Sequence, residues 1–454
     1  MAGCCRLKAS SFVRTIDRRC CSSVIDAAGM DDLLVAQAVW ANLVHVASQL
    51  RLNSTNTTRG RAQHTVSSFS RRSVLGCANI TDVDELAVGR RVAQARDVAD
   101  ITQDGLARAV GLDRTAIKHL ESGERKLDVT ELAAIAQVLG RHLSFFAQPP
   151  APAVVSRRAD AGLQHSTSRS LDIELDQFAG DVRTLFEVGE ISPVARTGRH
   201  APEDEVRAEQ MAKGIRSSLG MDLGSEYEAV RDLGQACQRL GLYTYSASLG
   251  EAGPDGASVE VSGEYLDVGA AVVNGDVPSG RRRVTLAHQL GHWVCGDPYG
   301  SSTSPETENL IHAFALHFLA PRAGLHIIWG DHDDWSDRDR VLAASATYGL
   351  SWSATLQQLK NVGIIDFDRL QELREFDPPL GDYLRLGFSR TDELASPYLS
   401  PGFVSACVNG YANQKLTQGR ALELLRGTLS ARDLPQKHAK SLDDIRASFT
   451  GHDG

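Results

Sequence analysis

The sequence predicts a predominantly helical α+β protein, and three observations carry that prediction. Short helical patterns separated by a glycine-containing turn, between residues 102 and 140, predict an all-α helix-turn-helix domain. Short apolar runs between residues 242 and 274, bounded by glycine-rich turns, predict a small sheet. An apolar helix with two histidines follows the sheet and is expected to pack on it, and the remaining patterns are helical. We therefore expect a helix-turn-helix domain, an α+β domain and a helical C-terminal tail.

Composition limits the possible functions. A chain of 454 residues suggests about three domains. The net charge of −9 gives no overall attraction to nucleic acid, so any contact with DNA must come from a local surface. No apolar run reaches the roughly 18 residues that span a bilayer, and the start of the chain lacks a secretory pattern. We therefore expect no membrane contact. The eight cysteines form no C-x-x-C pair, and we expect a reduced, cytoplasmic chain without disulfides.

Residues 1–78 differ in amino-acid composition from the rest of the chain. They hold ten basic residues against four acidic ones. Asp31–Leu50 has apolar residues at helical spacing, whereas Leu52–Ser73 is polar and predicts disorder. We interpret residues 1–78 as a flexible basic extension, and the alternative is a basic arm that lies on DNA.

The helix-turn-helix prediction depends on caps and turns. Thr102 and Asp113 are good N-cap residues, and Gly111 and Gly140 are placed to end helices. The helices expected from these capping and helix-ending residues are Asp82–Ala99, a short helix that ends at Val110, Arg114–Glu121 and Val129–Leu139.

The pattern T-Q-D-G-L-A-R-A-V-G-L-D-R-T-A-I-K-H-L-E-S-G-E-R-K-L, with E-L-A-A-I-A-Q-V-L-G after it, closely resembles the XRE/phage-repressor helix-turn-helix family over residues 82–146. The resemblance implies that Arg114–Glu121 is the recognition helix, with Ile117 and Leu120 facing the core. It also implies a homodimer on a double-stranded, palindromic DNA operator. The side chains expected to contact that DNA are Gln103, at a phosphate, and Arg114, Thr115 and Lys118, in the major groove. The alternative is a small helical bundle for protein contacts, because the segment carries nine basic and eleven acidic residues.

Proline-rich residues 148–152 mark a domain boundary, and a polar segment with one expected helix, Ile173–Phe186, follows. Two helices and three strands are expected next: Glu205–Gly220, Tyr227–Gly241, Leu242–Ala247, Ala257–Val261 and Leu266–Asn274. Helices after residue 325 are expected at Arg338–Tyr348, Ser351–Lys360, Asp366–Glu375, Phe403–Ala412 and Thr417–Leu425.

The two histidines of the apolar helix are His288 and His292. Four residues apart, they project from one helical face, as two ligands of a tetrahedral zinc ion do. In a zinc-peptidase H-E-x-x-H motif the second position is the glutamate that takes a proton from the metal-bound water, and here it is Gln289. The spacing therefore predicts metal binding without the general base. The alternative is a pair of structural histidines with no metal.

A third metal ligand is expected on the next helix, Glu306–Leu319, where Glu308 lies sixteen positions after His292. R-R-R-V-T-L-A-H-Q-L-G-H followed by E-N-L-I-H-A-F-A-L-H-F-L-A-P resembles the ImmA/IrrE family of zinc metallopeptidases, which implies a gluzincin-like α+β domain. Carried over, the zinc ligands are His288, His292 and Glu308. His312 stands where that family has Asn or Asp, which implies a hydrogen bond to a zinc histidine, and the alternatives are a ligand or a substitute base.

The domain organisation that follows is a basic extension (1–78), a helix-turn-helix domain (79–147), a linker (148–203), a metallopeptidase-like domain (204–325), a helical C-terminal region (326–435) and a polar tail (436–454). We predict a DNA-binding transcriptional regulator whose metallopeptidase-like domain binds zinc, is catalytically impaired by Gln289, and acts as a sensor or partner-binding module. One alternative is an active metallopeptidase that cleaves a repressor or antitoxin. The other is a toxin–antitoxin or mobile-element component that acts through protein contacts.

Overall fold

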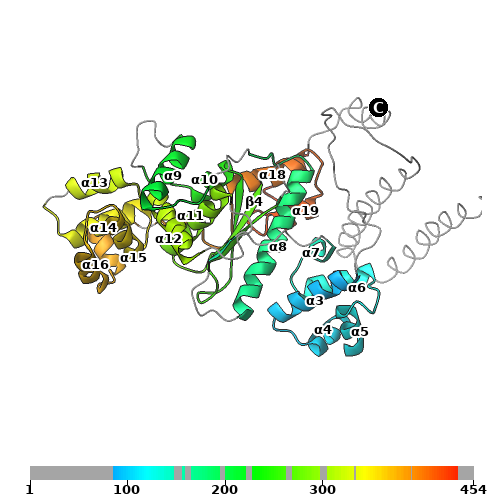
Figure 1. Cartoon of the computed structure of the whole chain (residues 1–454). Helices are drawn as coiled ribbons and strands as arrows, with labels where there is room; N and C mark the ends of the chain where they lie inside the picture. Colours follow the sequence, from blue (N-terminus) through cyan, green and yellow to red (C-terminus); the bar gives the residue numbers. More distant parts are fainter. Residues whose placement is uncertain are drawn as a thin grey trace, which may run out of the picture. The chain divides into compact units, whose positions relative to one another are not determined.

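The computed structural model describes residues 85–147, 156–158, 165–194, 200–220, 228–261, 268–296, 304–331, 334–389 and 391–437 (Figure 1). The amphipathic helix and disordered stretch expected in residues 1–78 lie outside the described residues, as does nearly all of the polar tail. The chain divides into two compact units, Met1–Asp84 and Glu85–Gly454, and every described residue belongs to the second. Among the described helices, none is by itself long and apolar enough to cross a bilayer; Pro305–Leu319 and Arg322–Gly330 pass that test only as a pair bent by 55°.

The helix-turn-helix domain has the caps and the four helices that its sequence predicts, together with a short fifth helix at Leu143–Ala147. Thr102 accepts a hydrogen bond from the backbone of Gly105, and Asp113 accepts one from Ala116. Gly111 takes the left-handed conformation (φ 72°) that ends the second helix. Ile117 is fully buried in the domain's apolar core, as predicted. The helices are α3 (Glu85–Val98), α4 (Gln103–Val110), α5 (Arg114–Glu121), α6 (Val129–Val138) and α7 (Leu143–Ala147).

A mixed sheet of five strands, in the order β1-β3-β4-β2-β5, forms the centre of the second part of the chain. Strands β2 and β4 are parallel, and every other neighbouring pair is antiparallel. The strands β3 and β4 are buried along their whole length, because helices cover both faces of the sheet. The strands are β1 (Ser156–Arg158), β2 (Leu242–Ala247), β3 (Gly256–Glu260), β4 (Gly269–Asn274) and β5 (Tyr398–Leu399).

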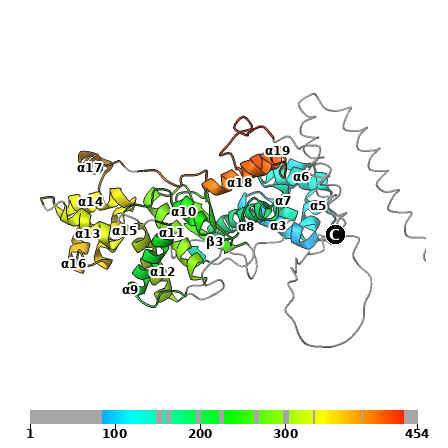
Figure 2. The same ribbon diagram turned by 90° about the horizontal axis from the view of Figure 1, so that it is seen from above.

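One face of the sheet carries α11 (Ser279–Cys295), whose apolar residues share a core with α9 (Glu205–Ser218), α10 (Leu233–Arg239) and α12 (Pro305–Leu319). The other face is covered by α8 (His165–Glu187) and α18 (Pro401–Ala412), where the rings of Phe178 and Phe403 pack at a tilt of 50° with their centroids 5.1 Å apart. The strands accordingly lie between α11 and α8 in Figure 1, and Figure 2 shows the same layers from above.

Residues 148–203 were expected to act as a linker, and the structure shows that much of this segment is part of the fold. Helix α8 supplies Leu175 and Phe178 to the core beneath the sheet, and β1 adds an edge strand. The reason is an apolar stripe at helical spacing, which has no other place to be buried. The expected helix Ile173–Phe186 lies within α8.

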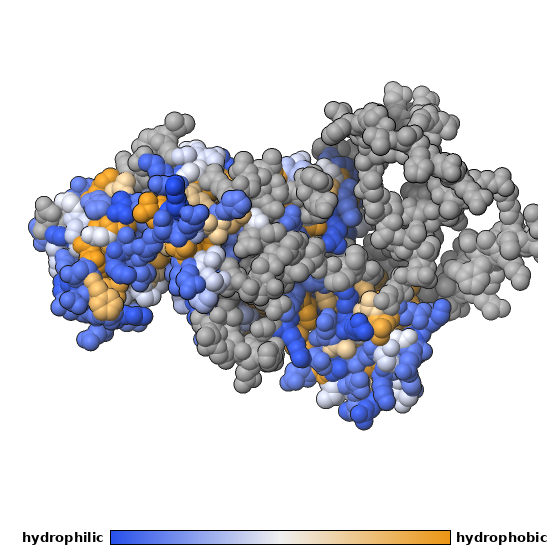
Figure 3. Space-filling view, viewed as in Figure 1, coloured by the Kyte–Doolittle hydropathy of each residue, from blue (hydrophilic) through white to orange (hydrophobic). Residues whose placement is uncertain are grey.

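The helical region after residue 325 also divides between two cores. The first group packs with α12: α13 (Arg322–Gly330), α14 (Asp337–Tyr348), α15 (Trp352–Asn361), α16 (Phe367–Arg374) and α17 (Leu380–Arg385). Strand β5 then joins the sheet, and α18 and α19 (Gln418–Leu424) pack on its far face. On the face that Figure 3 shows, the described surface is largely hydrophilic, with apolar side chains among the polar ones. Phe367 and Leu384 are among the exposed large apolar residues of the described chain.

Ion pairs join the helix-turn-helix domain to α8 and α19. Arg91 pairs with Asp176 at 2.9 Å, Arg141 pairs with Glu174, and His142 lies 2.8 Å from Glu423. Burial alone raises the pKa of Glu423, but the hydrogen bond and charge of His142, together with Arg420, outweigh it and lower that pKa to about 2.

This shift predicts a measurable pH dependence of stability. A carboxyl whose pKa is lower in the folded than in the unfolded state stabilises the fold above about pH 4.5, and the contribution disappears as the pH falls towards 2. We expect Glu423→Gln to reduce the free energy of unfolding at pH 7 and to leave it unchanged near pH 2, measured by urea denaturation. An equal loss at both pH values would show that the charge of Glu423 is not what stabilises the contact.

Candidate functional site

Helix α11 positions the two histidines. It follows β4 directly, and nearly all of its residues are buried, because the sheet lies on one side and α12 on the other. Gly291, between the histidines, permits the close approach of α12. A Cβ atom at this position would lie 2.8 Å from side-chain atoms of both Ile311 and Phe314. The missing side chain therefore brings α12, and Glu308 with it, against the histidine face of α11.

His288, His292 and Glu308 converge on one point. The Nε2 atom of His288 lies 3.1 Å from Nε2 of His292 and 3.1 Å from Oε2 of Glu308. The Nε2 atom of His292 lies 3.4 Å from the same carboxylate oxygen. Ligands at about 2.0–2.1 Å from a tetrahedral zinc ion lie about 3.3 Å apart, so the three donor atoms have the separation that a shared ion requires. These are the metal-type donors that the described residues bring within 4.8 Å of one another.

The charge state of Glu308 also suits a metal ligand. Hydrogen bonds with His288 and then His292 lower the pKa of this carboxyl far below its usual value, although partial burial opposes the shift. The side chains of His288 and His292 are 4% and 3% exposed, whereas the Glu308 side chain is 38% exposed. Glu308 is therefore anionic at neutral pH. The two histidines reach the point where the three donor atoms converge from the buried side, and Glu308 reaches it from the more exposed side.

Gln289 is completely buried beside the histidines. Its Oε1 atom accepts a hydrogen bond of 2.7 Å from the hydroxyl of Ser258 on β3, while its Nε2 atom has no partner among the described residues. A carboxamide has no basic site at neutral pH, so Gln289 can donate or accept hydrogen bonds here but cannot take up a proton. Nothing in the sequence pattern had singled out Ser258, which becomes visible only when β3 is placed beside α11.

His312 lies next to the three donors and outside their group. It is half-buried on α12, one turn after Glu308, and its ring centroid is 6.2 Å from that of His288. The role of His312 as a hydrogen-bonding partner of a zinc histidine stays a prediction.

Charged contacts fix the N-terminal turns of α11, and sequence reasoning did not assign them. Arg281 pairs at 2.5 Å with the buried carboxylate of Asp255, which directly precedes β3. Arg282 pairs with Asp392, and Arg283 with Glu393, on the segment before β5. The three consecutive arginines gave a local signal, but pairing them with residues 26 to 110 positions away needs the three-dimensional structure.

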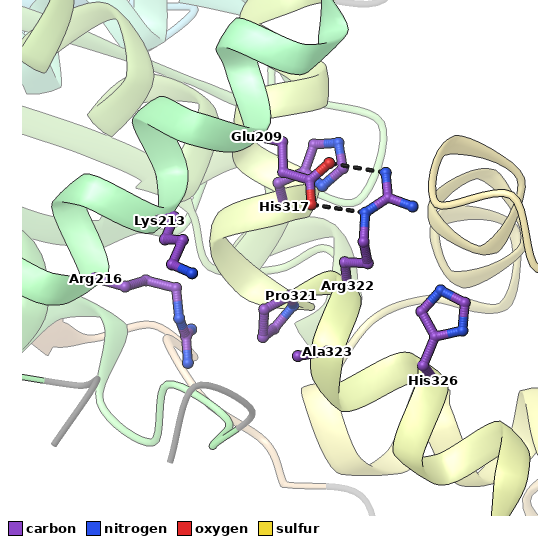
Figure 4. A pocket seen from close by; sticks show the side chains of 8 residues that line it. All are labelled: Glu209, Lys213, Arg216, His317, Pro321, Arg322, Ala323 and His326. Carbon is purple, nitrogen blue, oxygen red and sulfur yellow. Dashed lines mark hydrogen bonds and ion pairs between the residues drawn. The ribbon is translucent and has the colours of Figure 1, made fainter. Parts of the chain in front are cut away.

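A separate pocket of about 300 Å³ lies between α9, α12 and α13, and Figure 4 shows its lining. Arg322 holds Glu209 there with two hydrogen bonds of 2.7 and 2.8 Å. His317 is buried, its Nδ1 atom accepts a hydrogen bond from the amide of Gln358, and burial lowers the pKa of its ring. None of the three converging donors lines this pocket. The lining residues are Glu209, Lys213, Arg216, His317, Pro321, Arg322, Ala323 and His326.

Helix α5, the predicted recognition helix, presents the predicted DNA-facing residues to solvent. Arg114, Thr115 and Lys118 are exposed on one side, while Ile117 and Leu120 are buried on the other. Gln103 is half-buried, and its amide donates a hydrogen bond of 2.7 Å to Glu121, which also binds Arg96. The amide of Gln103 is thus engaged within the domain, and its contact with a phosphate stays a prediction.

Comparison with known proteins agrees with the predicted helix-turn-helix domain and with the predicted metallopeptidase-like domain. A helix-turn-helix family model matches residues 92–146, and an IrrE N-terminal-like domain model matches residues 237–360. No curated protein matches the chain. Two solved structures are similar: ComR from Streptococcus suis (12% identity, 81% of this chain and 91% of that chain, TM-score 0.14) and apo competence regulator ComR from Streptococcus vestibularis (12%, 80% and 97%, 0.14). The two family matches confirm the predicted fusion.

Proposed function

Because the chain joins a helix-turn-helix domain to an IrrE N-terminal-like domain, we propose that it is a transcriptional regulator whose second domain binds zinc and senses a ligand without cutting it. The observation that carries this proposal is the combination of three converging metal donors with a buried carboxamide at the position of the general base. Relative to a zinc-peptidase H-E-x-x-H motif, the chain has the metal donors but lacks the glutamate that accepts the proton.

Zinc at this site would be held by His288, His292 and Glu308, and the donor set fits a zinc ion with an open coordination position. A zinc ion so bound supplies a Lewis acid that attracts carbonyl, carboxylate or water oxygens. The Ser258 hydroxyl holds the Gln289 carboxamide in place, and the buried N–H groups of that carboxamide bond to no described residue. The site is therefore suited to binding a peptide or partner segment.

The DNA side of the proposal rests on α5. Arg114, Thr115 and Lys118 form a polar, exposed face that a major groove can accept, and a homodimer would read a palindromic operator. Ligand binding at the second domain would change DNA affinity, and by reciprocity DNA would change ligand affinity by the same factor.

The DNA contact is tested by Arg114→Ala and Lys118→Ala. We expect each to weaken operator binding by about 1–3 kcal/mol if it reads a base, or to lower the salt slope by about one if it contacts a phosphate. Arg207→Ala, which removes an exposed arginine on α9, is the charge-matched control and should leave both unchanged. The measurement is fluorescence anisotropy with operator DNA selected from genomic fragments. Loss of binding in the control alone, or in none of the three, contradicts the assigned DNA face.

An active metallopeptidase that cleaves a repressor or antitoxin is the second candidate, and the intact set of three donors favours it. The two candidates differ in the effect of restoring a carboxylate at residue 289. If the protein is a sensor, the wild-type chain binds zinc and cleaves no substrate. If it is an active peptidase, the wild-type chain cleaves a helix-turn-helix repressor without any substitution at residue 289.

A further inference from the structure

The pocket between α9, α12 and α13 is a second place where the described chain can hold a small molecule. Its volume of about 300 Å³ is at the lower end of the range for small-molecule sites, so a ligand that fills it must be small. In Figure 4, Lys213 and Arg216 of α9 face Pro321 and Ala323, at the start of α13, across the pocket. The three converging metal donors belong to another part of the surface, since none of them lines this pocket.

The lining carries more positive than negative charge. Lys213, Arg216 and Arg322 are cationic, whereas Glu209 is the one carboxylate among the described lining residues. The ion pair of Arg322 with Glu209 cancels one charge of each sign. His317 adds no charge, because burial lowers the pKa of its ring. Three cations and one carboxylate leave the lining with an excess of two positive charges, which favours an anionic ligand.

Arg216 is a fixed cation in the wall of the pocket. It is only 2% exposed, and its two terminal nitrogens donate hydrogen bonds to the backbone carbonyl oxygens of Phe318, at 2.8 Å, and Glu228, at 2.5 Å. Carbonyl oxygens carry no net charge, so these bonds hold the guanidinium in place without cancelling its charge. A cation that is already held in position loses little conformational freedom when an anion binds beside it.

The start of α13 adds a second feature that favours an anion. The N-cap residue, Pro321, provides no side-chain cap, so no capping side chain accepts from the N–H groups of the first turn. Pro321, Arg322 and Ala323 all line the pocket, which places this turn against it. The N-terminus of a helix carries a partial positive charge, and phosphate groups bind well at such a position.

We propose that this pocket binds a small phosphorylated molecule, with its phosphate group between Lys213 and Arg216 on one side and the first turn of α13 on the other. A phosphate monoester carries a charge of about −1.5 to −2 at pH 7, which matches the excess positive charge of the lining, whereas a carboxylate carries a single negative charge. Arginine, lysine and helix N-termini are also the groups that recognise phosphate in proteins. The binding goes beyond the proposed function; only an effect of the ligand on DNA affinity would rest on it.

The test is isothermal titration calorimetry of the full chain with glycerol phosphate as the probe. The chain is first freed of metal with a chelator and dialysed, so that phosphate cannot bind a zinc ion at the converging donors. We expect one probe molecule per chain, and acetate to bind about tenfold more weakly because it carries less charge. Inorganic phosphate is titrated in parallel. Binding of either phosphate compound supports the site, and their order of affinity shows whether the ligand is free phosphate or a phosphate ester.

Two substitutions locate the binding. Lys213→Gln removes a cation from the lining and should weaken probe binding by about tenfold, the factor that one charged hydrogen bond gives. Ala323→Asp puts a carboxylate at the second residue of α13, where an acidic side chain suits the helix, and should abolish binding. The matched controls should bind the probe as the wild type does: Arg207→Gln removes an exposed cation from α9 outside the pocket, and Ser353→Asp adds a carboxylate at the second residue of α15.

Equal affinity for acetate and glycerol phosphate, or unchanged probe binding in both Lys213→Gln and Ala323→Asp, overturns the proposal. Equal loss of binding in the two controls also overturns it, because net charge rather than this pocket would then decide the affinity. Thermal unfolding of each variant, followed by circular dichroism, shows that a loss of binding comes from a folded chain. Since neither zinc nor DNA is present, failure of this site is distinguishable from failure of the proposed function.

Discussion

Peptide hydrolysis is expected to rise by a factor of about 10² to 10⁴ when Gln289 is replaced by glutamate, the range that a positioned general base contributes. The carboxylate would occupy the buried position beside His288 and His292 where the carboxamide now accepts the Ser258 hydrogen bond. It would add the one group that the site lacks for taking a proton from water. The measurement is cleavage of a fluorogenic peptide and of a candidate repressor by the zinc-loaded variant.

Three controls make the result specific to the carboxylate. Gln289→Leu should remain inactive, because it has no proton acceptor. Gln289→Glu combined with His288→Ala should lose the gained activity, because the metal donors are then incomplete. Hydrolysis by the wild-type chain at the rate of Gln289→Glu would instead support the active-peptidase candidate and remove the basis for a sensor that does not cut.

Zinc is expected to raise the free energy of unfolding of the wild-type protein, whereas that of His288→Ala should not change when zinc is added. A ligand at a hundred times its dissociation constant stabilises the folded state by about 2.7 kcal/mol, provided that it does not bind the unfolded chain. With one of the three converging donors missing, the remaining two do not form such a site. The measurements are zinc content after dialysis and the melting temperature with and without added zinc.

His326→Ala is the matched control, since it removes an exposed histidine that lies outside the group of donors. It should keep one zinc per chain and the full thermal shift. His312→Ala should keep the ion with an affinity lower by about 10- to 100-fold if His312 supports a zinc histidine. A wild-type chain that takes up no zinc would leave His288 and His292 as structural histidines.

Local patterns in the sequence predicted much of the fold. The caps at Thr102 and Asp113 and the αL glycine at residue 111 fixed the helix-turn-helix boundaries, because each acts through neighbouring backbone groups. The same holds for β2, whose observed bounds are those that its pattern predicts. The sequence did not indicate the short helices α7, α13 and α17. Nor did it indicate β1 and β5, which are three and two residues long and form only by pairing with distant strands.

The candidate site shows the same division. Helical spacing indicated His288 and His292, and the position of Glu308 followed from the next helix. The hydrogen bond from Ser258 to Gln289 joins residues 31 apart, and the bond from Arg283 to Glu393 joins residues 110 apart. No periodicity within one element carries such information, so these contacts had to come from the three-dimensional structure.

Helix α8 belongs to two cores at once. Its Ile173 is buried with the apolar residues of the helix-turn-helix domain, while Phe178 is buried beneath the sheet. A truncation placed inside residues 148–203 therefore separates α8 from one of the two cores that it fills. Heat or denaturant should consequently unfold the DNA-binding domain and the sheet in a single cooperative transition. A substitution that destabilises one of the two parts should then lower the unfolding midpoint of both.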